Sequence, residues 1–168
     1  QWAKALGATV IGTAGSDDKT ALAKAHGCDH VINYTTEDFA ARVREITGGR
    51  GVDVVYDGVG KATFDKSLDC LRPRGLMVSF GNASGVVSIP DVTVLARKGS
   101  LYVTRPTGAA YLGQRPALLE GARQLFAAVQ SGAINKVEIG RTFPLADVAD
   151  AHRALEARET TGSVVLIP

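Results

Sequence analysis

The sequence has little of several things that would assign it to a specialised class of protein. Its 168 residues include two cysteines, one tryptophan and one methionine, and its formal net charge is only +2. Cys28 and Cys70 have no paired spacing, which argues against a disulfide scaffold and predicts a reducing compartment, the cytoplasm. The weak charge, without a basic and aromatic patch, argues against a nucleic-acid partner. No apolar run approaches a membrane span, so no membrane partner is expected.

The chain also lacks a usual beginning. It opens at Gln1, and residues 1–6 have the pattern of the last turns of a helix, with Gly7 in the position that often follows a helix end. No methionine, cap or first turn precedes this segment. We therefore expect the chain to have been cut from a longer protein.

What the sequence does have is a regular alternation of short apolar runs and amphipathic segments. In the clearest run, residues 52–56 lead into Asp57-Gly58-Val59-Gly60, which predicts a strand buried on both faces and a turn at its carboxyl end. The other predicted strands and helices alternate with short links between them. They are strands 8–14, 30–34, 76–80 and 100–104, and helices 16–26, 35–47, 61–71 and 92–97. This order predicts an α/β fold with a doubly wound, mostly parallel sheet.

The alternation changes after Pro106. A loop is predicted at 108–113, a long amphipathic helix at 116–131, a half-exposed strand at 137–143, a helix at 146–157 and a closing strand at 162–168. We therefore treat the last third of the chain as a separate part.

A dinucleotide site on such a sheet needs a glycine-rich turn after the first strand and a residue at the tip of the second strand that reads the adenosine ribose. No G-x-G-x-x-G occurs, so the first strand and its turn would lie upstream of this chain. At the tip of the predicted second strand, Gly15 and Ser16 replace the usual acidic residue, and Lys19 follows. Hydroxyl donors and a point cation suit a 2′-phosphate, which favours NADPH over NADH.

Plainer interpretations of single residues stay open. Lys19 could be a solvated surface lysine, and Phe80 could lie in the core. Tyr34 could simply cap a strand with its ring half-buried. Asp17 and Asp18 would repel a phosphate if they pointed inward, and we expect them to face solvent. The three histidines and two cysteines lack metal-ligand spacing, so no zinc site is expected.

Several segments together resemble one family. They are residues 12–13 with Lys19, then 31–34, 55–60, 67–71, 74–82 and 98–106. These segments look like the NADPH:quinone oxidoreductases, the zeta-crystallin-like, zinc-free branch of the medium-chain dehydrogenases. Residues 151–156 and 160–162 are similar to the C-terminus of the whole superfamily, so the resemblance covers essentially the whole chain.

The resemblance implies a two-domain enzyme that transfers hydride from NADPH to a quinone, with this chain as its C-terminal portion. Residues 1–108 would be the dinucleotide-binding domain without its first strand, and 109–168 a helix and the return into the catalytic domain. No acid–base residue is implied, so no catalytic residue is predicted, and the protein mainly positions the two rings. The implied cofactor contacts are Gly15, Ser16 and Lys19 at the 2′-phosphate, Tyr34 at the adenosine end, and Asp57, Gly58, Val59, Gly60, Phe80, Gly81, Asn82, Val103, Thr104 and Arg105 on the nicotinamide side.

Other functions stay open beside this one. Reduction of an enone or alkenal is the alternative within the superfamily, and a non-catalytic nucleotide-binding module is the alternative from another class. A methyltransferase on a similar sheet would need an acidic residue at the tip of the second strand, where residues 13–16 offer none. Since half of the active site would be absent, we expect this chain alone to be inactive.

The missing first strand has a physical consequence. In the doubly wound order 3-2-1-4-5-6, it lies between the strands predicted at 8–14 and 52–57. Unpaired buried backbone is costly, so we expect the gap to be closed by direct pairing, by a displaced segment or by a strand from a second chain. The strand at 100–104 should be an edge, where an uncharged sequence allows pairing across a two-fold axis, and the resemblance implies a homodimer there.

Overall fold

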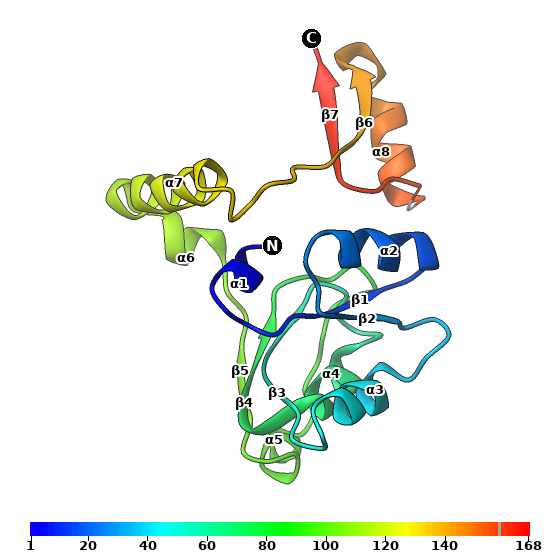
Figure 1. The fold of residues 1–168 in the computed structure, drawn as a ribbon, viewed down its shortest axis with the longest axis vertical. Helices are drawn as coiled ribbons and strands as arrows, with labels where there is room; N and C mark the ends of the chain where they lie inside the picture. The colour runs from blue at the N-terminus through cyan, green and yellow to red at the C-terminus, as the bar shows by residue number, and fades with distance from the viewer. Residues whose placement is uncertain (158) are drawn as a thin grey trace.

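The computed structural model describes residues 1–157 and 159–168. Strands and helices alternate along the chain, and every strand pair is parallel, which confirms the α/β class (Figure 1). The elements are α1 Trp2–Ala5, β1 Ile11–Ala14, α2 Asp17–Ala25, β2 His30–Asn33, α3 Phe39–Ile46, β3 Val52–Asp57, α4 Phe64–Asp69, β4 Leu71–Ser79, α5 Thr93–Arg97, β5 Tyr102–Thr104, α6 Gly108–Leu112, α7 Arg115–Gln130, β6 Ile139–Pro144, the 3₁₀ helix η1 Leu145–Asp147, α8 Val148–Glu156 and β7 Ser163–Ile167.

Side-chain caps decide where the first helices begin. The Ser16 hydroxyl accepts a hydrogen bond from the Lys19 backbone N–H at 3.4 Å and starts α2 at the predicted place. The next helix was predicted from residue 35, but α3 begins only at Phe39, because the Asp38 carboxylate caps it by accepting from the backbone N–H groups of Ala40 and Ala41. Residues 34–38 form the preceding turn.

The strands form three separate sheets, β1–β2, β3–β4–β5 and β6–β7. Closure of the gap between β1 and β3 by direct pairing or by a displaced segment is therefore wrong for the described residues. An apolar cluster of described residues connects β1 and β2 to β3 instead. In it, Phe39 and Val43 of α3 pack with Ile32 of β2, and Ile11 of β1 and Val55 of β3 pack against them. Side-chain burial under α3 thus replaces backbone pairing as the contact between β1 and β3.

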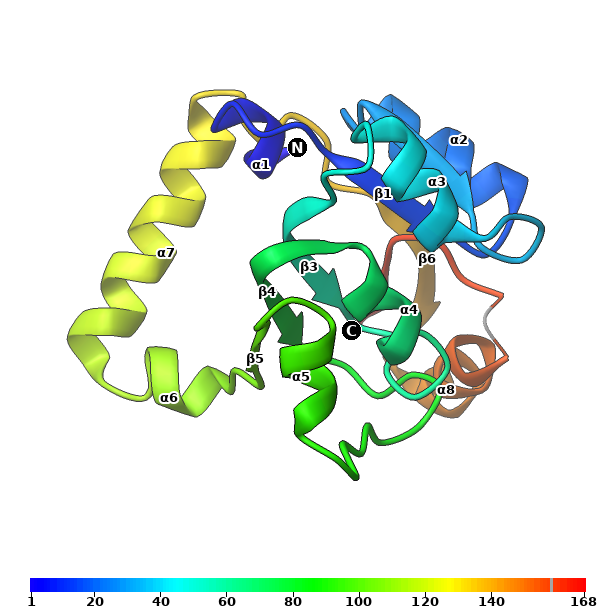
Figure 2. The same cartoon turned by 90° about the horizontal axis from the view of Figure 1, so that it is seen from below.

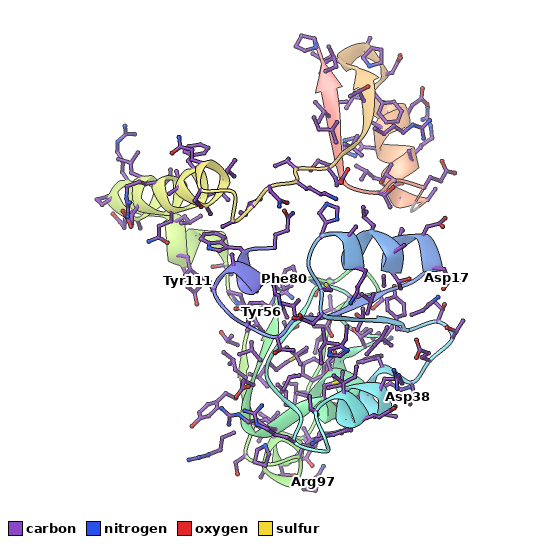
Figure 3. All side chains as sticks on the ribbon, in the orientation of Figure 1. Asp17, Asp38, Tyr56, Phe80, Arg97 and Tyr111 are labelled. Carbon is purple, nitrogen blue, oxygen red and sulfur yellow. The ribbon has the colours of Figure 1, made fainter. Side chains whose placement is uncertain are left out.

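Strand β3 is buried on one face only, which corrects the prediction of burial on both. Val54 is 39% exposed and Tyr56 is 74% exposed, on the face opposite the core. On the covered face, Leu68 of α4 packs with Leu71 and Met77 of β4, and each of these three is at most 1% exposed. Tyr56 and Phe80, which is 54% exposed, are both labelled in Figure 3.

Strand β4 begins earlier than predicted and carries a bulge. Leu71 pairs with Val52, and Leu76 pairs with Val54, so the extra residues between them form a bulge inside the strand where a turn was predicted at 73–75. Arg74 adopts φ 59° in this bulge, and its backbone N–H donates to the Gly99 carbonyl at 2.8 Å.

Strand β5 pairs only with β4 among the described residues and is therefore an edge strand, as predicted. The segment predicted as a loop at 108–113 contains helix α6 instead, because the Thr107 hydroxyl caps it by accepting from the Ala110 N–H at 3.3 Å. No described helix is long and apolar enough to span a membrane.

The C-terminal strands β6 and β7 and helix α8 form a unit of their own, joined to α7 by an extended segment (Figures 1 and 2). The Gln1 side chain holds this segment, because it accepts from the N–H groups of Asn135 and Lys136 and donates to the Lys136 carbonyl. The His26 ring also lies 3.0 Å from the Glu138 carboxylate, which links α2 to the start of this unit. The boundary predicted after residue 108 stays a prediction.

Candidate functional site

Two loops meet at the carboxyl ends of β3 and β4, where ligands bind in open parallel sheets. The N–H groups of Phe80 and Gly81 donate to the Asp57 carbonyl at 3.0 and 3.3 Å. A Cβ atom on Gly81 would lie 2.1 Å from the Gly58 carbonyl oxygen, so the loops pack backbone against backbone here because residue 81 is glycine. The turns predicted to line the nicotinamide side are thus brought together.

Asp57 organises the first of these loops from inside. Its carboxylate is buried, with the residue 5% exposed. It accepts from the backbone N–H groups of Val59 and Gly60 at 2.8 and 2.9 Å, and from the hydroxyls of Thr63 and Ser67 at 2.7 and 2.8 Å. Burial alone would raise the pKa of Asp57, but the hydrogen bonds outweigh it and the pKa is lowered. The Asp57 side chain therefore stays charged, and both of its oxygens accept hydrogen bonds from the protein.

Phe80 directly follows β4 in the second loop and lies outside the core. It is 54% exposed, and a Cβ atom on Gly58 would lie 3.0 Å from its ring. An exposed aromatic ring against a glycine backbone offers a flat apolar surface at the end of β4.

Arg105 braces the second loop from the end of β5. Its guanidinium donates to the carbonyls of Ser79 and Gly81 at 2.9 and 3.1 Å. With the Asn82 amide oriented so that its oxygen faces Arg105, that oxygen accepts at 3.2 Å. The preceding residues 103–104 pair with residues 77–78 of β4, which sets Arg105 beside the loop.

A second group of predicted residues lies at the tip of β1. The Tyr34 phenol packs on Gly15 so closely that a Cβ atom there would lie 2.7 Å from the phenol oxygen. Ser16 follows as the cap of α2, and the half-buried Lys19 makes no side-chain hydrogen bond or ion pair with any residue that the structure describes. No hydrogen bond within the described part of the chain joins this group to the loops at β3 and β4.

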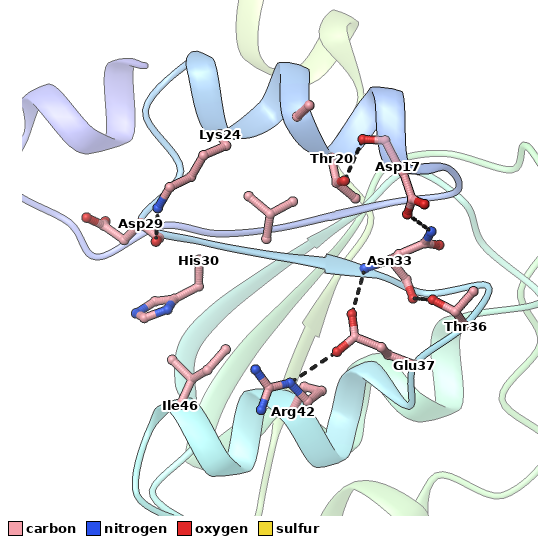
Figure 4. A pocket seen from close by; sticks show the side chains of 12 residues that line it. Asp17, Thr20, Lys24, Asp29, His30, Asn33, Thr36, Glu37, Arg42 and Ile46 are labelled. Carbon is pink, nitrogen blue, oxygen red and sulfur yellow. Dashed lines mark hydrogen bonds and ion pairs between the residues drawn. The ribbon is translucent and has the colours of Figure 1, made fainter.

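Asp17 and Asp18 are both exposed, as expected, and the Asp17 carboxylate also has a partner within the protein. That carboxylate accepts from the Asn33 side-chain amide at 2.7 Å. Asp17 and Asn33 help to line a cavity of about 570 Å³ between α2, β2 and α3 (Figure 4).

Three residues that were not predicted as site residues shape these groups: Asn33, Thr63 and Ser67. Thr63 and Ser67 stand four positions apart and so share a helix face toward Asp57, a spacing that was visible in the sequence. Asn33 was predicted as part of a strand, although asparagine is also a common turn residue and Thr35 and Thr36 follow shortly after it. Within the described part of the chain, no group of three or more His, Cys, Asp or Glu side chains is placed to hold a metal ion.

Comparison with known proteins places this geometry in context. A family model described as zinc-binding dehydrogenase matches residues 1–112. Quinone oxidoreductase 1 of Escherichia coli (strain K12) is 51% identical over 170 residues, covering 100% of this chain and 52% of the relative. The 2-haloacrylate reductase of a Burkholderia species is 51% identical over 168 residues, covering 99% of this chain and 50% of the relative.

Among solved structures, the crystal structure of Escherichia coli quinone oxidoreductase complexed with NADPH superposes with a TM-score of 0.94 at 51% identity. The match covers 99% of this chain and 52% of that one. The chain thus spans about half the length of the curated relatives it matches.

Proposed function

This chain belongs to the zinc-binding dehydrogenase family, and from that premise we propose that it is the cofactor-binding portion of an NADPH-dependent oxidoreductase that reduces quinones. Two features support the proposal. The relatives include quinone oxidoreductases, and one that superposes closely was crystallised with NADPH. The chain itself has a pair of loops at the ends of β3 and β4 and a separate basic tip at β1.

The observation that carries the choice of cofactor is the tip of β1. Gly15 and Ser16 leave it without an acidic side chain, and the Lys19 ammonium is not engaged by any described residue. An acidic residue at this position would accept from the ribose diol of NADH, whereas a hydroxyl and a free cation favour the 2′-phosphate of NADPH. The Tyr34 ring packed on Gly15 would flank the adenosine end.

The nicotinamide side is assigned to the loop pair. NADPH, when bound, supplies the hydride. Gly58, Val59 and Gly60 would present backbone that a ring can approach, and the Phe80 ring and Asn82 amide would face the same side. Asp57, Gly81, Arg105 and residues 103–104 would act through the shape of these loops, since their observed contacts are within the protein. These residues orient the ring, and none is assigned a proton transfer.

Reduction of an activated alkene is the second candidate for the substrate. The 2-haloacrylate reductase is as similar to this chain as the quinone oxidoreductases are, at 51% identity. Hydride transfer to a quinone and to a conjugated alkene both need NADPH bound with its nicotinamide ring held in place. The residues of this chain are therefore compatible with both substrates.

Further properties are proposed with this function. Residues 1–108 would form the cofactor domain, and 109–168 a helix and the return into a catalytic domain. We propose a cytoplasmic, zinc-independent enzyme, since hydride transfer between two bound rings needs no metal. We also propose a homodimer through β5, where Tyr102 is 61% exposed on a free strand edge.

The test is a titration of the chain with NADPH and NADH, repeated with Lys19→Ala. We expect NADPH to bind more tightly and Lys19→Ala to lose about tenfold in NADPH affinity, with NADH affinity within about twofold, because one charge-assisted contact to the 2′-phosphate is removed. Lys24→Ala is the matched control, since Lys24 belongs to the same helix but donates to the Asp29 carbonyl. Equal affinity for the two nucleotides, equal effects of the two substitutions, or no binding at all would contradict the proposal.

A further inference from the structure

Asn33 is a buried polar residue to which the proposed cofactor site gives no role. It ends β2, is 8% exposed, and lies between the first turn of α2 and the turn at 34–38. Its side-chain oxygen accepts from the N–H and the hydroxyl of Thr35 at 3.1 and 2.6 Å. Because the Thr35 N–H can only donate, the amide oxygen must face it, and the amide nitrogen must face the other way.

That nitrogen faces Asp17, to whose carboxylate it donates at 2.7 Å (Figure 4). Asp17 is the first residue of α2, directly after the Ser16 cap. The bond draws the carboxylate toward the end of β2 and into the cavity beside it. Among the described residues this carboxylate accepts from Asn33 and from no backbone N–H of the first turn of α2, where Ser16 is the cap.

The direction of the Asp17 carboxylate affects how strongly a phosphate can bind near the N-terminus of α2. The N-terminus of α2 and the Lys19 ammonium are the positive features near the tip of β1. A carboxylate that turned over this N-terminus would offset both and repel a phosphate. Across a few ångströms of water, such repulsion corresponds to about a fivefold to tenfold loss of affinity.

We propose that Asn33 is a specificity-determining positioning residue: its amide holds the Asp17 carboxylate away from the N-terminus of α2 and thereby keeps that end of the helix open to the 2′-phosphate of NADPH. The inference rests on the proposed use of NADPH. It adds that a residue on the neighbouring strand sets the preference between NADPH and NADH without contacting the nucleotide.

The test compares the ratio of NADPH to NADH affinity, measured by titration, in the wild-type chain and in variants. Asn33→Asp keeps the acceptor for Thr35 but replaces the donor to Asp17 with a like charge, so we expect the ratio to fall about fivefold to tenfold. The double variant Asn33→Asp/Asp17→Asn has the wild-type net charge and restores the hydrogen bond with donor and acceptor exchanged. It should recover the ratio to within about twofold.

Asp18→Asn is the matched control. It removes the neighbouring exposed carboxylate of the same helix turn, and we expect it to change the ratio by less than about threefold, because a solvated charge is screened. Should Asn33→Asp fail to fold by circular dichroism, Asn33→Ala and Asn33→Ala/Asp17→Asn provide the same comparison without a second carboxylate.

The outcomes separate the two proposals. A wild-type chain that binds neither nucleotide, or both equally, overturns the cofactor assignment and this inference together. A wild-type preference for NADPH that survives Asn33→Asp, or a loss that falls equally on NADPH and NADH, overturns the role of Asn33 alone. Failure of the double exchange to recover the ratio would likewise show that Asn33 serves only the turn at 34–38.

Discussion

Replacing Asp57 with asparagine should loosen the turn that leads to the nicotinamide side. The carboxylate accepts hydrogen bonds from two backbone N–H groups and two hydroxyls. In Asp57→Asn the single amide oxygen can keep the bonds from Val59 and Gly60, but these become neutral bonds. The amide nitrogen then faces Thr63 and Ser67, whose hydroxyls must turn to accept.

The expected cost follows from these contacts. Hydrogen bonds to a charged group contribute about 1.5–3 kcal/mol each and neutral ones about 1 kcal/mol, and part of the difference is regained by the rotated hydroxyls. We therefore expect Asp57→Asn to lower the free energy of unfolding by about 2–4 kcal/mol, a large part of the stability of an ordinary domain. Urea denaturation followed by circular dichroism measures this loss.

The effect should also depend on pH. Because the pKa of Asp57 is lowered from its ordinary value of 3.8, its ionisation stabilises the fold fully above that value, and the contribution is lost as the pH falls below it. The difference in stability between wild type and Asp57→Asn should be constant above about pH 5 and shrink below pH 3.8.

Asp65→Asn is the control, since Asp65 is an exposed residue of the neighbouring helix α4. It should change the stability by less than about 0.5 kcal/mol. An effect of Asp57→Asn no larger than that of Asp65→Asn, or one independent of acid pH, would refute the reasoning that a charged, fully bonded carboxylate holds this turn.

Two further predictions test the same region and its core. Gly81→Ala places a methyl group 2.1 Å from the Gly58 carbonyl oxygen, so it should cost about 2–4 kcal/mol in urea denaturation and weaken NADPH binding. Gly108→Ala, where nothing lies within 4 Å, should do neither, and equal effects of the two would contradict the close approach of the loops. Burial raises the pKa of the Cys70 thiol to about 12, so in the folded chain Cys70 should resist iodoacetamide at neutral pH and react only in urea, as followed by mass spectrometry. Equal labelling with and without urea would show that this part of the core is open.

Much of the fold was predictable from local signals. The Ser16 cap, the apolar run before Asp57 and the short links between segments depend on residues close in sequence, and they predicted α2, β3 and the α/β class correctly. The uncharged segment ending at Thr104 is likewise an edge strand as predicted. The predicted bounds were wrong where two local signals compete. Residues 35–38 form a turn before the Asp38 cap, although they were predicted to open α3. Thr107 caps a short helix in a segment whose glycines predicted a loop.

The sequence predicted which residues lie at the candidate site, but not which way their side chains point. The resemblance implied that residues 57–60 and 80–82 share the nicotinamide side, and the structure brings these two loops together. The Asp57 carboxylate turns into the protein because Thr63 and Ser67 meet it there. Asp17 turns toward β2 because Asn33 meets it. Each direction depends on a partner in another element.

The alternation of strands and helices up to Pro106, the Ser16 cap and the place of the glycine turns could be read from the sequence, because these features depend on backbone preferences and spacing within a few residues. Long-range packing is what joins β1 and β3 through an apolar cluster under α3 rather than by pairing, and what leaves Tyr56 exposed. The same holds for the buried carboxylate of Asp57 and the held carboxylate of Asp17. The physical reason is that burial and hydrogen-bond partners are set by residues distant in the chain, which no local pattern specifies.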